Sequence, residues 1–351
     1  MKMISIKKSD WAHAMEKVQD TYILAGPVRN KKGHTFRELG KGEIPDLEYK
    51  VTAMSPKSVV LPKSELMFSY SLDNSKEVHH IMEDVPFDES LRAAVGIRPY
   101  DARAIEILKK NFDTDHYKDP YFIRRYEKLT LVGMAENNPA DVNFSTSCNT
   151  GPFDESCLDI LLADGGDEYI GKVLTEKGEK FAEAAGFGEG SEDIEARIEE
   201  LKKAAEARIK SEVSFDRIKE MTILDMYEAP FWEDMAFSCL NCGTCTYACP
   251  TCWCFDIQDE VKGKKGVRMR NWDTCMSEVY SVHTTGHDPR HHDWERTRNR
   301  FMHKLKYFLD KYEDGIMCVG CGRCVTQCPV NIDIRKVCRQ MNDYEPSKTQ
   351  A

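Results

Sequence analysis

The cysteines of this chain are concentrated in two short stretches. Of the 14 cysteines, only Cys148 and Cys157 precede residue 239. Residues 239–250 read CLNCGTCTYACP and residues 318–329 read CVGCGRCVTQCP, so both have the spacing Cys-x2-Cys-x2-Cys-x3-Cys-Pro. Thiolates are strong ligands for iron and zinc, and three of them within one short loop can hold three corners of an inorganic cluster. Two copies of this pattern predict metal–sulfur chemistry.

The spacing matches the bacterial ferredoxin pattern, in which three close cysteines hold one [4Fe–4S] cluster and the fourth ligates the other. A zinc site is the alternative, but four-cysteine zinc sites normally use two Cys-x2-Cys pairs with a longer spacer. The Gly after each second cysteine permits backbone conformations that a side chain would obstruct, and the Pro suits a turn leaving the cluster. We therefore expect two clusters: cluster A on Cys239, Cys242, Cys245 and Cys328, and cluster B on Cys318, Cys321, Cys324 and Cys249.

Six cysteines lie outside these two sets: Cys148, Cys157, Cys252, Cys254, Cys275 and Cys338. Cys252, Cys254 and Cys275 share the segment 250–317 with five histidines, so a third metal centre is one interpretation, with Cys254 and Cys275 as its best candidates. The alternative is that they are buried thiols, because free cysteine packs well in protein cores. The single residue between Cys252 and Cys254 favours this alternative, since it suits neither zinc pairs nor a cluster loop.

Positive charge also gathers between the two motifs. A cluster with four thiolates is negatively charged, so nearby guanidinium groups would raise its reduction potential. Ordinary pairing with carboxylates is an equal alternative, and docking of an acidic partner subunit is a third. The residues concerned are Arg268, Arg270, Arg290, Arg296, Arg298 and Arg300.

The overall composition excludes several classes of protein. The chain has 351 residues, with 49 Lys and Arg against 59 Asp and Glu, a formal net charge of −10. A nucleic-acid-binding surface would show a clustered basic excess. No segment approaches the roughly 18 apolar residues of a membrane span, and the first residues lack the apolar core of a signal peptide. We therefore expect a cytoplasmic protein, in which the cysteines stay reduced rather than forming disulfides.

The length suggests two domains, and the cysteine distribution places their boundary near residue 225. Residues 1–225 are expected to form a mixed α/β scaffold or docking domain, without a P-loop, a nucleophile elbow or a GxGxxG sequence, so no catalytic residue is predicted. Apolar periodicity predicts helices at 11–19 and 101–112, the latter capped by Asp101. It also predicts strands at 47–53, 58–61, 93–97 and 129–134, and a charged helical stretch at 192–221.

Residues 226–351 are expected to form a mainly helical, ferredoxin-type domain with a helical insertion at 250–317 between the motifs. Apolar residues at helical spacing from Trp294 to Tyr312 predict that a helix returns the chain to the second motif. The fold class predicted for the whole chain is α+β.

Several motifs together resemble a known family. Residues 249–256 read CPTCWCFD, residues 268–275 read RMRNWDTC, and residues 286–290 read GHDPR. Further matches lie in the front part at 26–28, 96–101, 119–121 and 150–152, so the resemblance covers most of the chain. The chain resembles the β subunits of cytoplasmic nickel–iron sulfhydrogenases and the A subunit of anaerobic sulfite reductase. It is also similar to the iron–sulfur subunits of flavin oxidoreductases that serve heterodisulfide reductase.

The resemblance implies an electron-transfer subunit of an oxidoreductase complex in anaerobic metabolism, which relays electrons and is not an enzyme by itself. Its implied partners are a subunit that binds flavin and NAD(P) and a catalytic or iron–sulfur subunit; neither nucleic acid nor a membrane span is implied. Many members have cysteine where this chain has Tyr100, Glu136, Asn143 and Ser145, so the resemblance implies that an additional cluster is absent here. The alternative function is a self-contained iron–sulfur reductase with its substrate site in the front domain or in the Cys/His-rich insertion.

Overall fold

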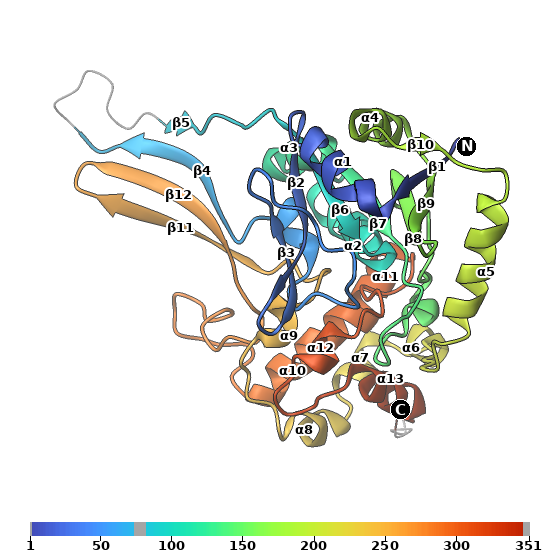
Figure 1. Ribbon diagram of the computed structural model, residues 1–351. Coiled ribbons are helices and arrows are strands. Elements are labelled where there is room, and N and C mark those ends of the chain that lie inside the picture. The colour runs from blue at the N-terminus through green and yellow to red at the C-terminus, as the bar shows by residue number, and fades with distance from the viewer. Residues whose placement is uncertain (1, 74–81, 347–351) are drawn as a thin grey trace.

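The computed structural model describes residues 2–73 and 82–346. Its main feature is an eight-stranded sheet with the order β10-β1-β9-β8-β7-β6-β2-β3 (Figure 1). The four neighbours β8, β7, β6 and β2 are parallel, and the remaining pairs are antiparallel. The strands are β1 (Lys2–Lys7), β2 (Tyr22–Asn30), β3 (Gly33–Glu38), β6 (Leu91–Ile97), β7 (Leu129–Met134), β8 (Ile160–Asp164), β9 (Glu168–Val173) and β10 (Gly188–Glu189).

Helices cover both faces of this sheet, as a parallel sheet requires. Helices α1 (Trp11–Val18) and α4 (Glu176–Ala185) pack on one face through side chains such as Met15 and Phe181. Helices α2 (Pro99–Phe112), α3 (Pro120–Glu127) and α5 (Ile194–Glu206) pack on the other face. The front part of the chain is therefore a three-layer α/β/α structure, which confirms the mixed α/β prediction.

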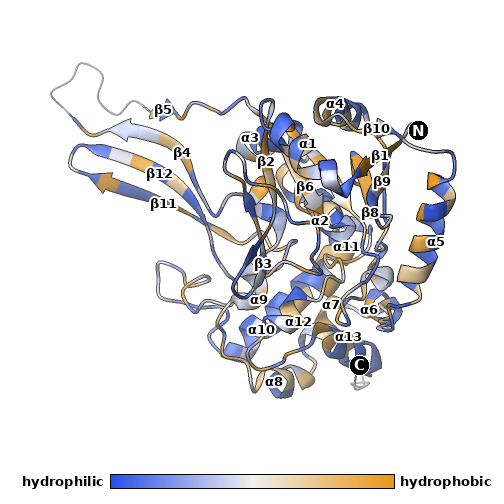
Figure 2. Cartoon of the chain, in the orientation of Figure 1, coloured by the Kyte–Doolittle hydropathy of each residue, from blue (hydrophilic) through white to orange (hydrophobic). Residues whose placement is uncertain are grey.

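A second sheet extends away from this body as an arm (Figure 1). Its order is β11-β12-β4-β5, with all pairs antiparallel. The strands β4 (Ser64–Ser71) and β5 (Met82–Asp84) come from the front part, whereas β11 (Phe255–Lys262) and β12 (Lys265–Trp272) come from the insertion. Polar residues line much of the arm, while apolar residues gather in the body (Figure 2).

Short helices surround the two cysteine motifs. Their core contains Trp232, Phe301, Leu305, Val337 and Met341, all of which are buried. The helices are α6 (Asp216–Glu220), α7 (Ile223–Tyr227), α8 (Phe231–Ala236), α9 (Thr244–Tyr247), α10 (Asp293–Met302), α11 (Phe308–Tyr312), α12 (Arg323–Thr326) and α13 (Ile334–Asp343), with a π-helical turn at His303–Tyr307 between α10 and α11. None of the helices in the described residues is long and apolar enough to cross a membrane.

The structure confirms the predicted helices at 11–19 and 294–312 and the predicted strands at 93–97 and 129–134. The expectation of a mainly helical cluster domain with a helical insertion is wrong, because the first half of the insertion is the β11–β12 hairpin. Only the second half of the insertion is helical. The domain boundary near residue 225 stays a prediction.

Four further local predictions differ from the structure. Residues 47–53 form no strand; they belong to a loop that packs over the sheet and buries Leu47 and Tyr49. Residues 58–61 form no strand either, because they belong to a short 3-10 helix and its end. Asp101 does not cap α2, which begins after Arg98; its carboxylate is buried and bonded to Arg323. The charged stretch 192–221 is divided into α5 and α6 by a loop.

Candidate iron–sulfur centres

Each cysteine motif forms a loop followed by a one-turn helix, α9 or α12. The residues before these helices are Gly243 and Gly322, with φ values of 72° and 73°. A Cβ atom on Gly322 would lie 2.5 Å from Cγ2 of Val142, and one on Gly243 would lie 2.9 Å from Cγ2 of Thr274. The prediction that glycine is required after the second cysteine is therefore confirmed, both by the left-handed backbone and by the lack of space.

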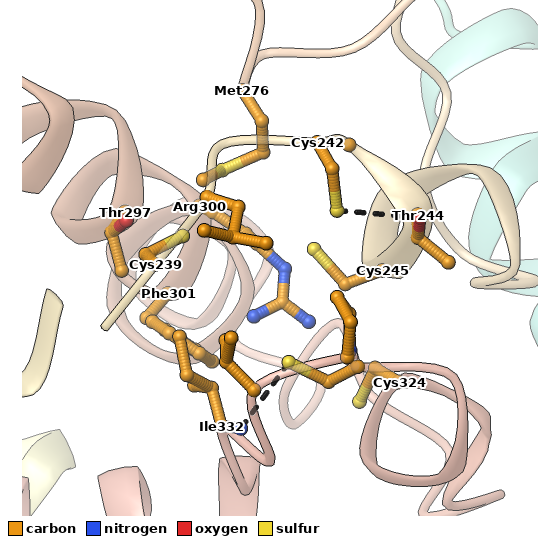
Figure 3. A pocket seen from close by; sticks show the side chains of 15 residues that line it. Cys239, Cys242, Thr244, Cys245, Met276, Thr297, Arg300, Phe301, Cys324 and Ile332 are labelled. Atoms are coloured by element: carbon orange, nitrogen blue, oxygen red, sulfur yellow. Dashed lines mark hydrogen bonds between the residues drawn. The ribbon is translucent and has the colours of Figure 1, made fainter.

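The eight predicted ligands line two adjacent cavities. The first, shown in Figure 3, is lined by five cysteines: Cys239, Cys242 and Cys245 of the first motif, and Cys324 and Cys328 of the second. The second cavity is lined by the complementary set: Cys318, Cys321, Cys324 and Cys249. Cys324 lines the first cavity as well, so the two cavities share a wall. Each predicted set of four therefore lines one cavity, whereas the assignment of ligands to the two clusters stays a prediction.

The two cavities differ in their exposure to solvent. In the first, Cys242 is exposed and the other three predicted ligands are half-buried. In the second, Cys249 and Cys321 are buried and the remaining two are half-buried. One cavity therefore reaches the surface, and the other lies in the interior.

Backbone and hydroxyl groups contact several of the sulfur atoms. The Asn241 N–H donates to Sγ of Cys239 at 3.4 Å, and the Ile332 N–H donates to Sγ of Cys328 at 3.2 Å. Thr244 Oγ1 lies 3.4 Å from Sγ of Cys242, and Thr251 Oγ1 lies 3.3 Å from Sγ of Cys249. Hydrogen bonds to cluster thiolates raise the reduction potential, because they stabilise the more negative reduced form.

Two buried cations face the cavities, Arg300 in the first and Lys304 in the second. Figure 3 shows the Arg300 guanidinium group pointing into the first cavity, and its Nε is buried without a hydrogen-bond partner. Lys304 Nζ donates only to neutral groups, Thr251 Oγ1 at 2.9 Å and Met317 O at 3.4 Å. Burial alone would lower the pKa of Lys304, but the neighbouring thiolates of Cys249 and other cysteines more than offset it, so the pKa is raised.

These cations test whether the cavities suit an iron–sulfur cluster. A buried cation that has no carboxylate partner requires another source of negative charge. A [4Fe–4S] cluster with four thiolate ligands supplies that charge, and both cavities present the sulfur donors that iron prefers. The residues present therefore fit the group.

A buried ion pair connects the second motif to the front part. Arg323, between the second and third cysteines of that motif, donates to both carboxylate oxygens of Asp101 in α2, at 2.6 and 2.7 Å. Its Nε donates to Thr52 O at 2.9 Å. Arg323 and Asp101 are 1% and 2% exposed, so the pair is fully withdrawn from water. The ion pair therefore holds the second cysteine motif, which lines the interior cavity, against α2.

The remaining cysteines are distributed around the cavities. Cys252 hydrogen-bonds Cys249, and Cys148 hydrogen-bonds Cys318, so each lies beside a predicted ligand. Cys338 is buried in the helical core, whereas Cys157 lines a separate cavity beside α2 and α4.

Cys254 and Cys275 form a hydrogen-bonded pair at the base of the β11–β12 hairpin. The hydrogen bond from Cys275, opposed in part by burial, lowers the pKa of Cys254 to about 6. His303 lies against Trp253, with 5.5 Å between ring centroids, and burial lowers its pKa to about 4. Among the described residues, no three His, Cys, Asp or Glu side chains are placed to hold a single metal ion.

Of the six arginines predicted near the clusters, Arg300 lines a cavity. Arg268 pairs with Asp259 within the arm, and Arg270 pairs with Glu65 and Asp119. Arg296 donates hydrogen bonds to Asp293 and to two backbone carbonyls, and Arg298 lies over the Tyr227 ring. Arg290 is half-buried and precedes α10 in the chain. For Arg268, Arg270 and Arg296, pairing with carboxylates was therefore the better interpretation.

The sequence analysis missed Lys304 and Arg323. Lys304 follows Arg300 by four residues, so the helical spacing that predicted α10 also places both side chains on one face. Arg323 stands inside the second motif itself, and only its position between ligands could have drawn attention to it.

Tyr100, Glu136, Asn143 and Ser145, the positions at which the resemblance implied an absent cluster, are linked by hydrogen bonds. Tyr100 Oη donates to Oε1 of Glu136 at 3.2 Å, Asn143 Nδ2 donates to Oε2 of Glu136 at 2.7 Å, and the Ser145 N–H donates to Oδ1 of Asn143 at 2.7 Å. All four residues are buried. Burial raises the pKa of Glu136 to about 7, although the Arg98 charge opposes this shift.

Comparison with known proteins agrees with this geometry. Residues 238–332 match the family model of a 4Fe-4S dicluster domain. The fold and the site thus define an iron–sulfur protein whose C-terminal part is a [4Fe–4S] dicluster domain.

Over 347 residues the chain is 27% identical to Sulfhydrogenase 2 subunit beta of Pyrococcus furiosus, covering 98% of this chain and 99% of that subunit. No solved structure matches the chain. These two findings support the iron–sulfur β-subunit family that the motifs predicted, and they support an electron-transfer iron–sulfur subunit.

Proposed function

We propose that this chain carries two [4Fe–4S] clusters and relays electrons within a cytoplasmic oxidoreductase complex. Cluster A is held by Cys239, Cys242, Cys245 and Cys328, and cluster B by Cys318, Cys321, Cys324 and Cys249. The observation that supports the proposal is that each predicted set of four cysteines lines one cavity and draws on both motifs, with Cys324 shared between the two cavities. The electron donor and acceptor are a subunit that binds flavin and NAD(P) and a catalytic or iron–sulfur subunit of hydrogenase, sulfite reductase or heterodisulfide reductase type.

Each cluster, when bound, accepts and releases one electron at a time. The chain itself holds the clusters side by side, because Cys324 lines both cavities. Arg300 and Lys304 balance part of the negative charge that a cluster and its thiolates bring into the interior. Phe144 and Val319 close the second cavity with apolar surface and keep water away from cluster B.

The exposure of the two cavities supports an order of transfer. Cluster A lies where Cys242 reaches the surface, and cluster B lies against buried cysteines. Cluster A would therefore exchange electrons with a partner at the surface where Cys242 is exposed, and cluster B would transfer electrons within the interior of the subunit.

Metal analysis of anaerobically purified protein tests the proposal. Two [4Fe–4S] clusters give about eight irons per chain, and replacing Cys242 by Ser should remove about four of them if each cluster has its own ligand set. Replacing Cys157 by Ser, a cysteine in a separate cavity, is the matched control and should leave the iron content unchanged. A wild-type value near four irons, or zinc in place of iron, would contradict the proposal.

One observation favours the second candidate function, a self-contained reductase. A cavity of about 280 Å³ lies beyond the carboxyl ends of β6, β7 and β8 and is lined by Arg98, Glu136, Asn137 and Asp164, among others. Ligands in open α/β sheets often bind at this edge. Turnover of sulfite, polysulfide or a disulfide by the pure chain with an artificial electron donor would support this function, whereas rapid cluster reduction without turnover would favour the relay.

A further inference from the structure

The surface around the mouth of the first cavity exposes large apolar side chains. Phe237 follows α8 and is 93% exposed, and Leu240, between Cys239 and Cys242, is 65% exposed. The Cys239 N–H donates to Ala236 O at 2.8 Å, so the end of α8 is fixed directly beside the first predicted ligand of cluster A. Side chains of this size are normally withdrawn from water, and two of them this close together in the chain indicate a surface that another molecule covers.

The charged residues close to these apolar residues in the chain have one sign. Between residues 221 and 255, every charged residue is acidic: Asp225, Glu228, Glu233 and Asp234. Glu233 and Asp234 are exposed on α8, within one helical turn of Phe237. Arg300, the cation of the first cavity, is 5% exposed and faces inward, so it does not offset this charge at the surface.

We infer that the α8 face, defined as Glu233, Asp234, Phe237, Leu240 and Cys242, is the docking site of a redox protein with a basic rim. That protein presents lysine or arginine residues around an apolar patch in which its own cofactor reaches the surface. The apolar centre covers Phe237 and Leu240, and the basic rim meets the acidic side chains of α8. This inference rests on the proposed function, because the exchanged electron comes from cluster A.

The transfer step moves one electron and makes no bond. Cluster A passes from its reduced to its oxidised form, and the cofactor of the partner gains the same electron. The α8 face contributes contact and charge, which bring the partner to the edge of the protein at which Cys242 is exposed. Electrostatic complementarity of this kind acts mainly on the association rate and on its dependence on salt.

Ferric cytochrome c is a suitable probe, because lysines surround its exposed haem edge. The second-order rate of its reduction by the dithionite-reduced protein is measured by stopped flow at several salt concentrations, with methyl viologen as a small acceptor that needs no docking. The test variant is Glu233→Lys/Asp234→Lys. The matched control is Glu199→Lys/Glu200→Lys, an exposed acidic pair on α5, which lies at a different edge of the molecule (Figure 1).

We expect the α8 variant to react about tenfold more slowly with cytochrome c at low salt, with a weaker salt dependence, and the α5 variant to react like the wild type. Phe237→Ser/Leu240→Ser should slow the reaction while keeping the salt dependence. Carbodiimide cross-linking gives a readout independent of electron transfer: wild-type protein should couple to cytochrome c through Glu233 or Asp234, as mapped by mass spectrometry.

Equal slowing by the two charge variants, or cross-links spread over other acidic surfaces, would overturn the docking site while leaving the proposed function intact. A wild-type protein that reduces neither cytochrome c nor methyl viologen would instead contradict the proposed function. Iron content, measured for every variant, separates both outcomes from a failure to fold.

Discussion

Lys304 provides a direct test of the electrostatics of the interior cluster. Its side chain is 2% exposed, it lines the same cavity as Cys249, Cys318 and Cys321, and its two hydrogen-bond partners are neutral. The variant Lys304→Met keeps the length of the side chain and removes the charge. Because a positive charge stabilises the more negative reduced cluster, its removal should lower the reduction potential of cluster B.

The size of this shift follows from Coulomb's law. At roughly 6 Å and an effective dielectric constant of about 20, a unit charge contributes about 3 kcal/mol. For a one-electron couple, about 59 mV corresponds to a tenfold change in equilibrium constant, or about 1.4 kcal/mol. The expected shift is therefore on the order of 100 mV toward lower potential for cluster B. The shift should be smaller for cluster A, since Lys304 lines only the second cavity.

The assay is a redox titration of anaerobic protein followed by electron paramagnetic resonance. Arg268→Gln is the matched control, because this cation lies on the arm and pairs with Asp259 at 2.7 Å. It should shift neither potential by more than about 20 mV, since exposed paired charges contribute little. An unchanged or raised cluster B potential in Lys304→Met, at full iron content, would refute the reasoning.

Three further predictions concern stability, each measured by urea unfolding of anaerobic protein. Asp101→Ala should lower the free energy of unfolding by about 3–5 kcal/mol, because it leaves the buried Arg323 charge unpaired. The double variant Asp101→Ala/Arg323→Met removes that charge as well and should regain part of the loss. Equal losses in the two variants would argue against the ion pair. The pKa of Glu136 is raised to about 7 from its ordinary value of 4.5, so folding disfavours the charged form of this side chain. The free energy of unfolding of the wild type should therefore fall by about 3 kcal/mol relative to Glu136→Gln as the pH rises from below 4.5 to above 7. Parallel pH profiles of the two proteins would contradict this. Gly322→Ala should cost about 2–4 kcal/mol, whereas Gly263→Ala, at φ 63° with no atom within 4 Å, should cost only about 1 kcal/mol; similar costs would exclude a steric role for Val142.

The cysteine sets could be predicted from sequence because their spacing is local. Two-residue gaps force three thiols of each motif into one loop, and the crossed pattern then assigns the fourth. The strands β6 and β7 could also be predicted from the sequence, because they are short apolar runs next to turn residues. In each case the residues that decide the structure are neighbours in the chain.

The arm and the buried ion pair could not be predicted in this way. Strand β12 pairs with β4, so that Asn271 lies opposite Ser64, some two hundred residues earlier in the chain. Arg323 and Asp101 are 222 residues apart. The alternating residues at 47–53 resemble a strand for the opposite reason, since a loop lying over a sheet can also bury alternate side chains, here Leu47 and Tyr49. Local patterns do not report which distant segment covers a given surface.

The arm also bears on how this protein evolves. Its sheet is completed only when residues 64–71 pair with residues 265–271, and buried Arg270 reaches back to Glu65, with Nε 3.1 Å from Oε2. A recombination event that moved the cysteine-rich segment alone to another gene would leave Arg270 without its carboxylate partners and β12 without its neighbour. We therefore expect the chain to be inherited as a single unit, in agreement with a relative that matches it along 98% of its length. New electron-transfer complexes are expected to recruit the whole subunit rather than its cluster-binding segment.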